Sequence, residues 1–300
     1  MSEPLISIGE LVETLDEVVL FDLRWSLTDP TRGRDDYAAG HIPGAIFVDL
    51  DTDLTVPRGD GRHPLPPASE FTRALGEFGA GPGDEIIVYD DVAGAVAARM
   101  WWMLRAIGHQ KSRLLDGGLS AWVDAGLPVT DQPGWRSPTE YPAVDRFTGV
   151  VSIDGLAGRH LIDARVAERY RGEVEPIDPK AGHIPGAVNM PLSGNLGPEG
   201  RFLDNADLVE RYRDTPEGTI VSCGSGINAC HAALAVVLAG HPLPDIYIGS
   251  FSDWARRDLP VVTGDAPLPA AERWKPSNRR TPTNCCEWST GFARHRHGTA

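Results

Sequence analysis

The chain is poor in cysteine and has no long apolar run. Its four cysteines stand at 223, 230, 285 and 286 of 300 residues, and their spacing does not resemble the disulfide framework of a small secreted protein. No stretch approaches the roughly 20 apolar residues of a membrane-spanning helix. The N-terminus has no basic segment followed by an apolar one, so we expect no signal peptide and a reduced, cytoplasmic setting.

Positive charge is also scarce. The chain has 28 Lys and Arg against 42 Asp and Glu, a formal net charge of −14. This balance argues against nucleic acid or an anionic membrane as a general partner, although it leaves room for a local basic pocket that binds a small anion. The length is typical of two domains, each large enough to bury a core.

The segment around Cys223 is the most informative one. Residues 218–221 are predicted to end a buried strand, and residues 229–238 form a helix-like run closed by Gly240. A thiol between a strand end and a helix start faces free backbone N–H groups, which favour the nucleophilic thiolate. Gly224 and Gly226 let the backbone curl around the sulfur. The alternative is a buried structural cysteine in a turn.

The sequence contains a tandem duplication. An Asp-x-Arg element followed by Gly-His-Ile-Pro-Gly-Ala occurs at residues 22–45 and again at residues 163–187. Each copy later carries a Gly-x-x-Ser-x-Trp pattern, at 117–122 and 249–254. Copies of this length are domains and not the units of a short-period solenoid. Because His41 and His183 recur in both copies, we interpret them as structural groups that bond nearby loop carbonyls.

Each copy alternates short apolar strands with helical stretches, which predicts an α/β domain with a mainly parallel sheet flanked by helices. The predicted strands are residues 18–23, 45–48, 85–89 and 113–115 in the first copy, and 161–164, 187–189, 219–222 and 245–247 in the second. The clearest helices of the first copy are residues 71–79 and 96–107. We therefore expect domains at 5–130 and 146–263, a linker at 131–145, and a poorly ordered tail at 274–300.

These tandem signatures, with a reactive cysteine in the second copy alone, resemble the two-domain rhodanese sulfurtransferases over roughly residues 5–262. The resemblance implies two tandem rhodanese-like domains, of which the first is catalytically inert and the second carries the cysteine, with the active site between them. Asp90 stands where the first copy would have its thiol. A carboxylate cannot accept a sulfane sulfur, so the first domain is expected to be a scaffold.

The resemblance implies that Cys223 attacks the outer sulfur of a small donor and becomes a persulfide, which a thiol or cyanide then discharges. A thioredoxin-like protein is a further acceptor of this kind. No metal or organic cofactor is expected. The loop backbone would stabilise the anionic sulfur through the residues that follow Cys223, namely Gly224, Ser225, Gly226, Ile227, Asn228 and Ala229.

The loop Cys-Gly-Ser-Gly-Ile-Asn contains no cation, which resembles the members of the family that use 3-mercaptopyruvate. In those members a loop serine works with a histidine and an aspartate from the first domain, and the matching residues are Ser225, His63 and Asp51. Thiosulfate remains the alternative donor. The members that use 3-mercaptopyruvate bind its carboxylate with two arginines of the second domain. One matches Arg169, and Lys180 is the candidate replacement for the other, which is missing.

Two other classes of protein are considered. Cysteine-dependent phosphatases and arsenate reductases place an arginine six residues after the cysteine, where this chain has Ala229, so this class is disfavoured. A sulfur carrier that serves a protein acceptor stays open. Cys285 and Cys286 lie near two histidines, but their spacing fits no usual zinc pattern, and we expect no metal site.

Overall fold

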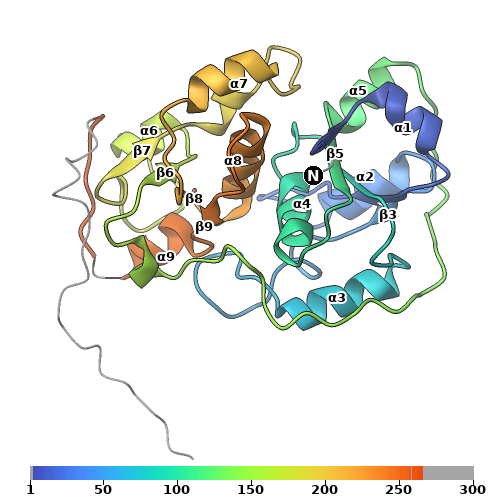
Figure 1. Ribbon diagram of the computed structural model, residues 1–300, viewed down its shortest axis with the longest axis horizontal. Helices are drawn as coiled ribbons and strands as arrows, with labels where there is room; N and C mark the ends of the chain where they lie inside the picture. Colours follow the sequence, from blue (N-terminus) through green and yellow to red (C-terminus); the bar gives the residue numbers. More distant parts are fainter. Residues whose placement is uncertain (1–2, 258, 266–300) are drawn as a thin grey trace, which may run out of the picture.

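The protein consists of two α/β halves that follow one another along the chain (Figure 1). The computed structural model describes residues 3–257 and 259–265. The predicted tail at 274–300, with Cys285 and Cys286, lies outside the described residues.

The first half is built on a five-stranded sheet in the order β1-β5-β4-β2-β3, and its strand pairs are all parallel. Parallel neighbours need crossover connections, which the helices supply on both faces. The strands are β1 (Leu5–Ile6), β2 (Val19–Asp22), β3 (Ile46–Phe47), β4 (Ile86–Tyr89) and β5 (Ser112–Leu115). The helices are α1 (Ile8–Thr14), α2 (Arg32–Ala39), α3 (Ala68–Glu77), α4 (Ala97–Ala106) and α5 (Gly118–Asp124).

The second half repeats this plan with a parallel sheet in the order β7-β6-β8-β9. A parallel bridge between Val150 and Ile246 takes the place of the edge strand β1. The strands are β6 (Leu161–Asp163), β7 (Ala187–Asn189), β8 (Ile220–Ser222) and β9 (Asp245–Ile246). The helices are α6 (Ala167–Arg171), α7 (Asn205–Tyr212), α8 (Ile227–Leu238) and α9 (Ser250–Arg256), with short 3-10 turns η1 (Ile153–Leu156) and η2 (Leu192–Asn195).

The predicted strands all exist, within one or two residues at their ends. The sequence did not predict the short helices α1 and α2, because neither has a long apolar face. The sequence does contain a start signal for α1: the Ser7 hydroxyl accepts the Glu10 N–H, and the Glu10 carboxylate accepts the Ser7 N–H. Such a capping box satisfies two N–H groups that the first turn leaves unpaired.

The two halves meet through α4 and α8, which pack against each other near the centre of the molecule (Figure 1). One continuous hydrophobic core includes residues of both helices, among them Trp101, Trp102 and Leu234. Residues 131–148 form no helix or strand and run along α3, where Thr139 donates its N–H to the Gly76 carbonyl. A shared core of this kind fixes the residues of one half relative to the other.

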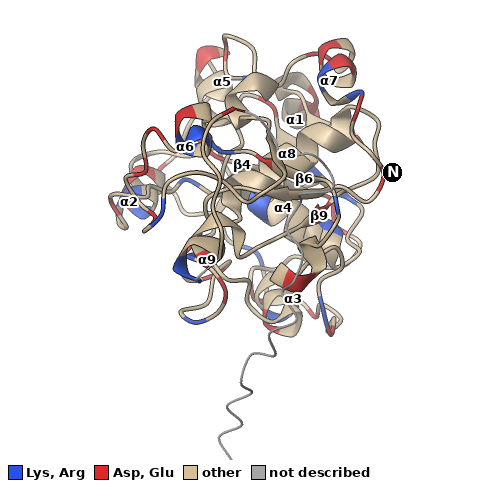
Figure 2. Cartoon of the chain, turned by 90° about the vertical axis from the view of Figure 1, so that its left-hand side faces the viewer, with Lys and Arg blue, Asp and Glu red and all other residues tan. Residues whose placement is uncertain are grey.

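Charged residues of both signs share the outward-facing helices α6 and α9 (Figure 2). In the part of the chain that the structure describes, no helix has the length and apolar character to cross a membrane.

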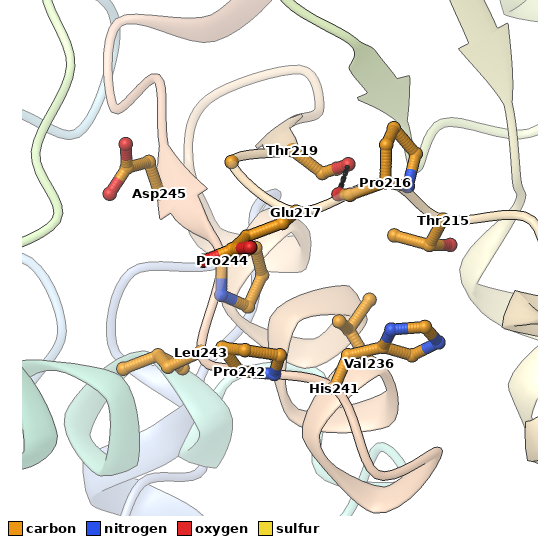
Figure 3. A pocket seen from close by; sticks show the side chains of 11 residues that line it. Thr215, Pro216, Glu217, Thr219, Val236, His241, Pro242, Leu243, Pro244 and Asp245 are labelled. Carbon is orange, nitrogen blue, oxygen red and sulfur yellow. Dashed lines mark hydrogen bonds between the residues drawn. The ribbon is translucent and has the colours of Figure 1, made fainter.

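A cavity of about 170 Å³ lies in the second half, at the ends of β8 and β9 that are opposite to Cys223 (Figure 3). It is lined mainly by the turn before β8 and by the loop before β9, and the Thr219 hydroxyl closes one side by donating to the Pro216 carbonyl. None of the predicted site residues contributes to it.

Candidate active site

Cys223 follows β8 directly and precedes α8. Gly226 takes a left-handed conformation with φ of 84°, and its N–H donates to the Cys223 sulfur at 3.1 Å. The Cys223 N–H donates to the Ser250 hydroxyl at 3.1 Å. The side chain is 3 % exposed. A hydrogen-bond donor aimed at the sulfur, together with the start of a 12-residue helix, stabilises negative charge there.

The corresponding loop of the first half holds an anion of its own. Asp90 follows β4 just as Cys223 follows β8, and its carboxylate is fully buried. It accepts four backbone N–H groups, each at 2.8–2.9 Å, from Val92, Gly94, Val96 and Ala97. Burial raises the pKa of Asp90, while these hydrogen bonds oppose the rise. The duplicated loop is therefore an anion cradle, occupied by a carboxylate in one half and by a thiol in the other.

A cavity of about 270 Å³ opens onto Cys223 between the two halves. The first half lines it with Trp25, Leu27, Arg62, His63 and Val96, and the second half with Arg165, Val166, Arg169, Ile177, Cys223, Gly224, Ser225, Ile227 and Asn228. Ala229, a further predicted cradle residue, is buried within α8 instead. Of the predicted cradle, Gly226 is the residue that donates to the sulfur within the described chain.

Arg169 lies in this cavity beside two buried carboxylates. Its Nε and Nη2 donate to the Glu175 carboxylate at 3.1 and 2.6 Å, and Nη2 also donates to Asp178 at 3.0 Å. Burial raises the pKa of Asp178. The pKa of Glu175 is lowered, because hydrogen bonds from Arg169 and from two backbone N–H groups outweigh its burial. These carboxylates hold the Arg169 guanidinium in one orientation.

The second cation of the cavity comes from the first half. Arg62 donates from Nη1 to the other oxygen of Asp178, so one carboxylate bridges Arg62 and Arg169. Sequence reasoning missed Arg62, although it directly precedes His63. The available signal was a cation next to a candidate catalytic histidine in a glycine-rich loop.

Lys180 does not line the cavity. Its ammonium donates to the carbonyls of Arg257 and Leu259, each at 3.1 Å, at the end of α9. The expectation that Lys180 replaces the missing arginine is therefore corrected by its position. The segment before Lys180 instead supplies carboxylates to the site, through Glu175 and Asp178.

His63 is buried and lines the same cavity as Ser225. Burial, followed by the positive charges of Arg99 and Arg62, lowers the pKa of His63 to about 4. Its Nε2 lies 3.8 Å from Asp51 Oδ1, and its Nδ1 has no hydrogen-bond partner among the residues that the structure describes. The imidazole is thus neutral at neutral pH, and its contact with Asp51 is not an ion pair.

The structure brings Ser225 and His63 to one cavity, but Asp51 lies outside the lining. The Asp51 carboxylate is 42 % exposed and accepts the Trp25 indole N–H at 2.8 Å. In the described residues no hydrogen bond links Ser225 to His63. Ser225, His63 and Asp51 are therefore neighbours, but no continuous chain of hydrogen bonds connects them in the described residues.

Arg99 of α4 lies behind the loop of Cys223, where it contacts Gly226, and is fully buried. Its guanidinium donates to the carbonyls of His63 at 2.8 Å, Leu54 at 3.3 Å and Gly226 at 3.4 Å. It has no carboxylate partner in the described chain. It thus places a positive charge near Cys223 and Cys230. A lone cation in the apolar run 95–104 was the sequence signal for this residue, and it was overlooked.

Cys230 is buried in α8, and its thiol donates to the Gly226 carbonyl at 3.3 Å. Burial raises the pKa of Cys230 to about 12, so this thiol stays protonated. Within the described residues, no group of three or more His, Cys, Asp or Glu side chains is arranged to hold a metal ion.

Comparison with known proteins agrees with this geometry. The profile of the family described as "Rhodanese-like domain" matches residues 7–125 and 152–257. A "Probable 3-mercaptopyruvate sulfurtransferase" of Pseudomonas aeruginosa is 42% identical over 88% of this chain and 99% of its own. A "Thiosulfate sulfurtransferase" of Gallus gallus is 31% identical over 80% of this chain and 87% of its own.

A solved structure is similar as well. The "3-mercaptopyruvate sulfurtransferase from Leishmania major" superimposes with a TM-score of 0.76 at 30% identity, and the match covers 85% of this chain and 75% of that one. The chain belongs to the rhodanese family. It is a sulfurtransferase with two rhodanese domains, and the predicted fold class and enzyme class are confirmed.

Proposed function

We propose that Cys223 is the residue that accepts the sulfur and carries it as a persulfide. The position of Cys223 supports this proposal: it lines a cavity between the two halves that Arg62 and Arg169 also line, and the Gly226 N–H donates to its sulfur. The first half has no comparable nucleophile, since Asp90 fills its loop. Because the first half has Asp90 where the second half has Cys223, we propose that the first domain is inert and the second domain is catalytic.

We propose 3-mercaptopyruvate as the preferred donor, with thiosulfate as the alternative. The charge balance of the cavity supports a monoanion. Each guanidinium beside the cavity is matched by a carboxylate of the same cluster, which consists of Arg62, Arg165, Arg169, Asp163, Glu175 and Asp178. A monoanionic donor brings one uncompensated negative charge into a cavity that is partly shielded from water, whereas dianionic thiosulfate brings two. The cost of the second charge in such a site is large.

In the first half-reaction the Cys223 thiolate attacks the thiol sulfur of 3-mercaptopyruvate. A sulfur–sulfur bond forms, the carbon–sulfur bond breaks, and its electron pair passes to pyruvate enolate. The enolate then takes a proton to give pyruvate. We assign this proton transfer to Ser225 and the neutral imidazole of His63, with Asp51 orienting the ring.

In the second half-reaction a thiolate or cyanide removes the outer sulfur and regenerates Cys223. The mouth of the cavity suits an acceptor with an apolar surface, because Leu27, Val166 and Ile177 line it and are exposed. We propose that the acceptor is a small thiol or a thioredoxin-like protein, and that the enzyme works in the cytoplasm. A dedicated sulfur carrier, the second candidate, would be poor with small thiols and good with a protein acceptor.

The test compares 3-mercaptopyruvate and thiosulfate as donors to cyanide, with one enzyme preparation. We expect kcat/KM to be at least about tenfold higher for 3-mercaptopyruvate, which corresponds to about 1.4 kcal/mol of transition-state binding. A ratio that favours thiosulfate would overturn the donor proposal.

Cys223→Ser is the matched variant for the persulfide step. It should abolish transfer from both donors without changing the thermal midpoint. Mass spectrometry after donor alone should detect one added sulfur on the Cys223 peptide of the wild type, and none on the variant. Turnover by Cys223→Ser at the wild-type rate would exclude the persulfide mechanism.

A further inference from the structure

Two guanidinium nitrogens from different halves of the molecule converge on Gly224, the residue after Cys223. A Cβ atom built on Gly224 would lie 2.9 Å from Arg62 Nη2 and 3.4 Å from Arg169 Nη1. The absence of a side chain at Gly224 therefore lets both guanidinium groups approach the loop closely, and all three residues line the cavity of Cys223.

We propose that Arg62 is the second residue that binds the carboxylate of the sulfur donor, opposite Arg169. The inference rests on the proposed function of the Cys223 cavity and deepens it. The inert first half thereby contributes a substrate-binding residue, in addition to lining one side of the cavity.

The hydrogen bonds of the two arginines support this role, because each guanidinium is anchored on one side and unused on the other. Arg62 donates from Nη1 to Asp178, and Arg169 donates from Nε and Nη2 to Glu175 and Asp178. Within the described chain no hydrogen bond uses Arg62 Nη2 or Arg169 Nη1. Arg62 Nε is buried and also without a partner. Of these unused donors, Arg62 Nη2 and Arg169 Nη1 face Gly224.

This arrangement suits a planar carboxylate. Asp178 is buried and binds Arg62 with one oxygen and Arg169 with the other, so it sets the separation of the two guanidinium groups before the donor arrives. A carboxylate above Gly224 would accept one N–H group from each arginine, and such charge-assisted hydrogen bonds are strong and directional. Preorganised donors avoid the entropy of ordering two long side chains on binding.

The position also restricts the length of the donor. The carboxylate would bind next to Gly224, and the sulfur must reach the adjacent Cys223. Short 2-oxo acids with a thiol on the next carbon meet this condition. The site therefore selects small thiol-bearing carboxylates over long or uncharged sulfur compounds.

The experiment uses an anionic and a neutral reagent that both alkylate the Cys223 thiolate. Iodoacetate carries a carboxylate, whereas iodoacetamide is its neutral counterpart. The ratio of their rates at the Cys223 peptide, followed by mass spectrometry, measures carboxylate binding beside the sulfur without any sulfur donor. Steady-state KM for 3-mercaptopyruvate is measured on the same preparations.

Arg62→Gln should lower the iodoacetate-to-iodoacetamide ratio by about 10-fold or more and raise KM for 3-mercaptopyruvate by about 10- to 100-fold. Arg62→Lys keeps the positive charge but loses the planar guanidinium with its paired N–H donors. Its iodoacetate-to-iodoacetamide ratio should therefore lie between those of the wild type and Arg62→Gln. The matched control is Arg58→Gln, an exposed arginine of the same loop that lines a different cavity. It should leave both quantities within about twofold.

The two readouts separate this inference from the donor proposal. An unchanged alkylation ratio in Arg62→Gln, together with a reduced ratio in Arg169→Gln, would overturn the role of Arg62. A reduced ratio in Arg62→Gln supports that role even if the wild type turns over thiosulfate alone, and that second result would overturn the donor proposal by itself. Arg62→Lys is the control for a folding defect, because it keeps a positive charge beside Asp178 and should leave the fold intact.

Discussion

His231 should make the protein sensitive to acid, because its imidazole is buried without a charge partner. It lies in α8 and is fully buried, with its ring stacked on Phe202 at a centroid distance of 4.5 Å. Within the described residues, neither ring nitrogen makes a hydrogen bond of ordinary geometry. Burial lowers the pKa of His231 from 6.5 to about 3, and the backbone of Ala93 opposes this shift only in part. The ring is therefore neutral in the folded protein at pH values well above 3.

The sign and size of the effect follow from proton linkage. As the pH falls below 6.5 the unfolded chain takes up a proton at His231, while the folded chain does not until about pH 3. Stability from this group is thus present above pH 6.5 and is lost progressively as the pH falls toward 3. Each pH unit in this window costs about 1.4 kcal/mol. Between pH 7 and pH 5 the free energy of unfolding should fall by about 2 kcal/mol because of His231 alone.

His231→Phe keeps the stacking on Phe202 and removes the titrating group. Urea denaturation of wild type and variant at about pH 7 and pH 5 gives a double difference in which other titrating groups and the changed packing cancel. We expect the variant to lose about 2 kcal/mol less than the wild type on acidification. His241→Gln, which removes a less buried histidine just beyond α8, is the control. Equal losses for wild type and His231→Phe would refute the assignment of a buried neutral imidazole.

Three further outcomes follow from the same structure. Asp90→Ala leaves four buried N–H groups without their acceptor and should lower the free energy of unfolding by about 3 kcal/mol in urea, with kcat/KM within about twofold of wild type; unchanged stability would contradict the anion cradle. Gly224→Ala places a methyl group 2.9 Å from Arg62 Nη2 and should raise KM for 3-mercaptopyruvate about 10-fold without a shift in thermal midpoint; an unchanged KM would show that the donor carboxylate binds elsewhere. His63→Gln should lower kcat with 3-mercaptopyruvate about 100-fold. It should affect thiosulfate much less, because sulfite leaves without needing a proton. Equal losses with both donors would exclude the proton-transfer role.

The first half does more than support the second. It supplies Arg62 and His63 to the cavity and Arg99 to the back of the Cys223 loop. Because α4 and α8 share one hydrophobic core, the packing of the two halves brings these groups to the cavity that Cys223 lines. A chain that kept the second domain alone would lose both the Arg62 guanidinium and the charge behind the loop.

Local pattern predicted the features that depend on neighbours along the chain. Several features each depend on a short run of residues and can be predicted without a structure. They are the apolar strands, the repeated turn with its histidine, and the loop between β8 and α8. The duplication made the comparison of Asp90 with Cys223 possible from the sequence, and the structure places both residues at equivalent strand ends. The fold class and the sulfurtransferase class followed from the same signatures.

The arrangement of charges around the cavity could not be obtained in this way. Lys180 was expected near the donor because it stands where an arginine is missing, yet its ammonium bonds carbonyls beyond α9. Arg62, far away in the sequence, occupies the cavity through its contact with Asp178. Sequence alone predicted which half carries the candidate nucleophile, and it predicted the enzyme class that the comparisons confirm. Only the packing of the two halves decided which cations face it, because that choice depends on long-range contacts and on carboxylates that no local pattern connects.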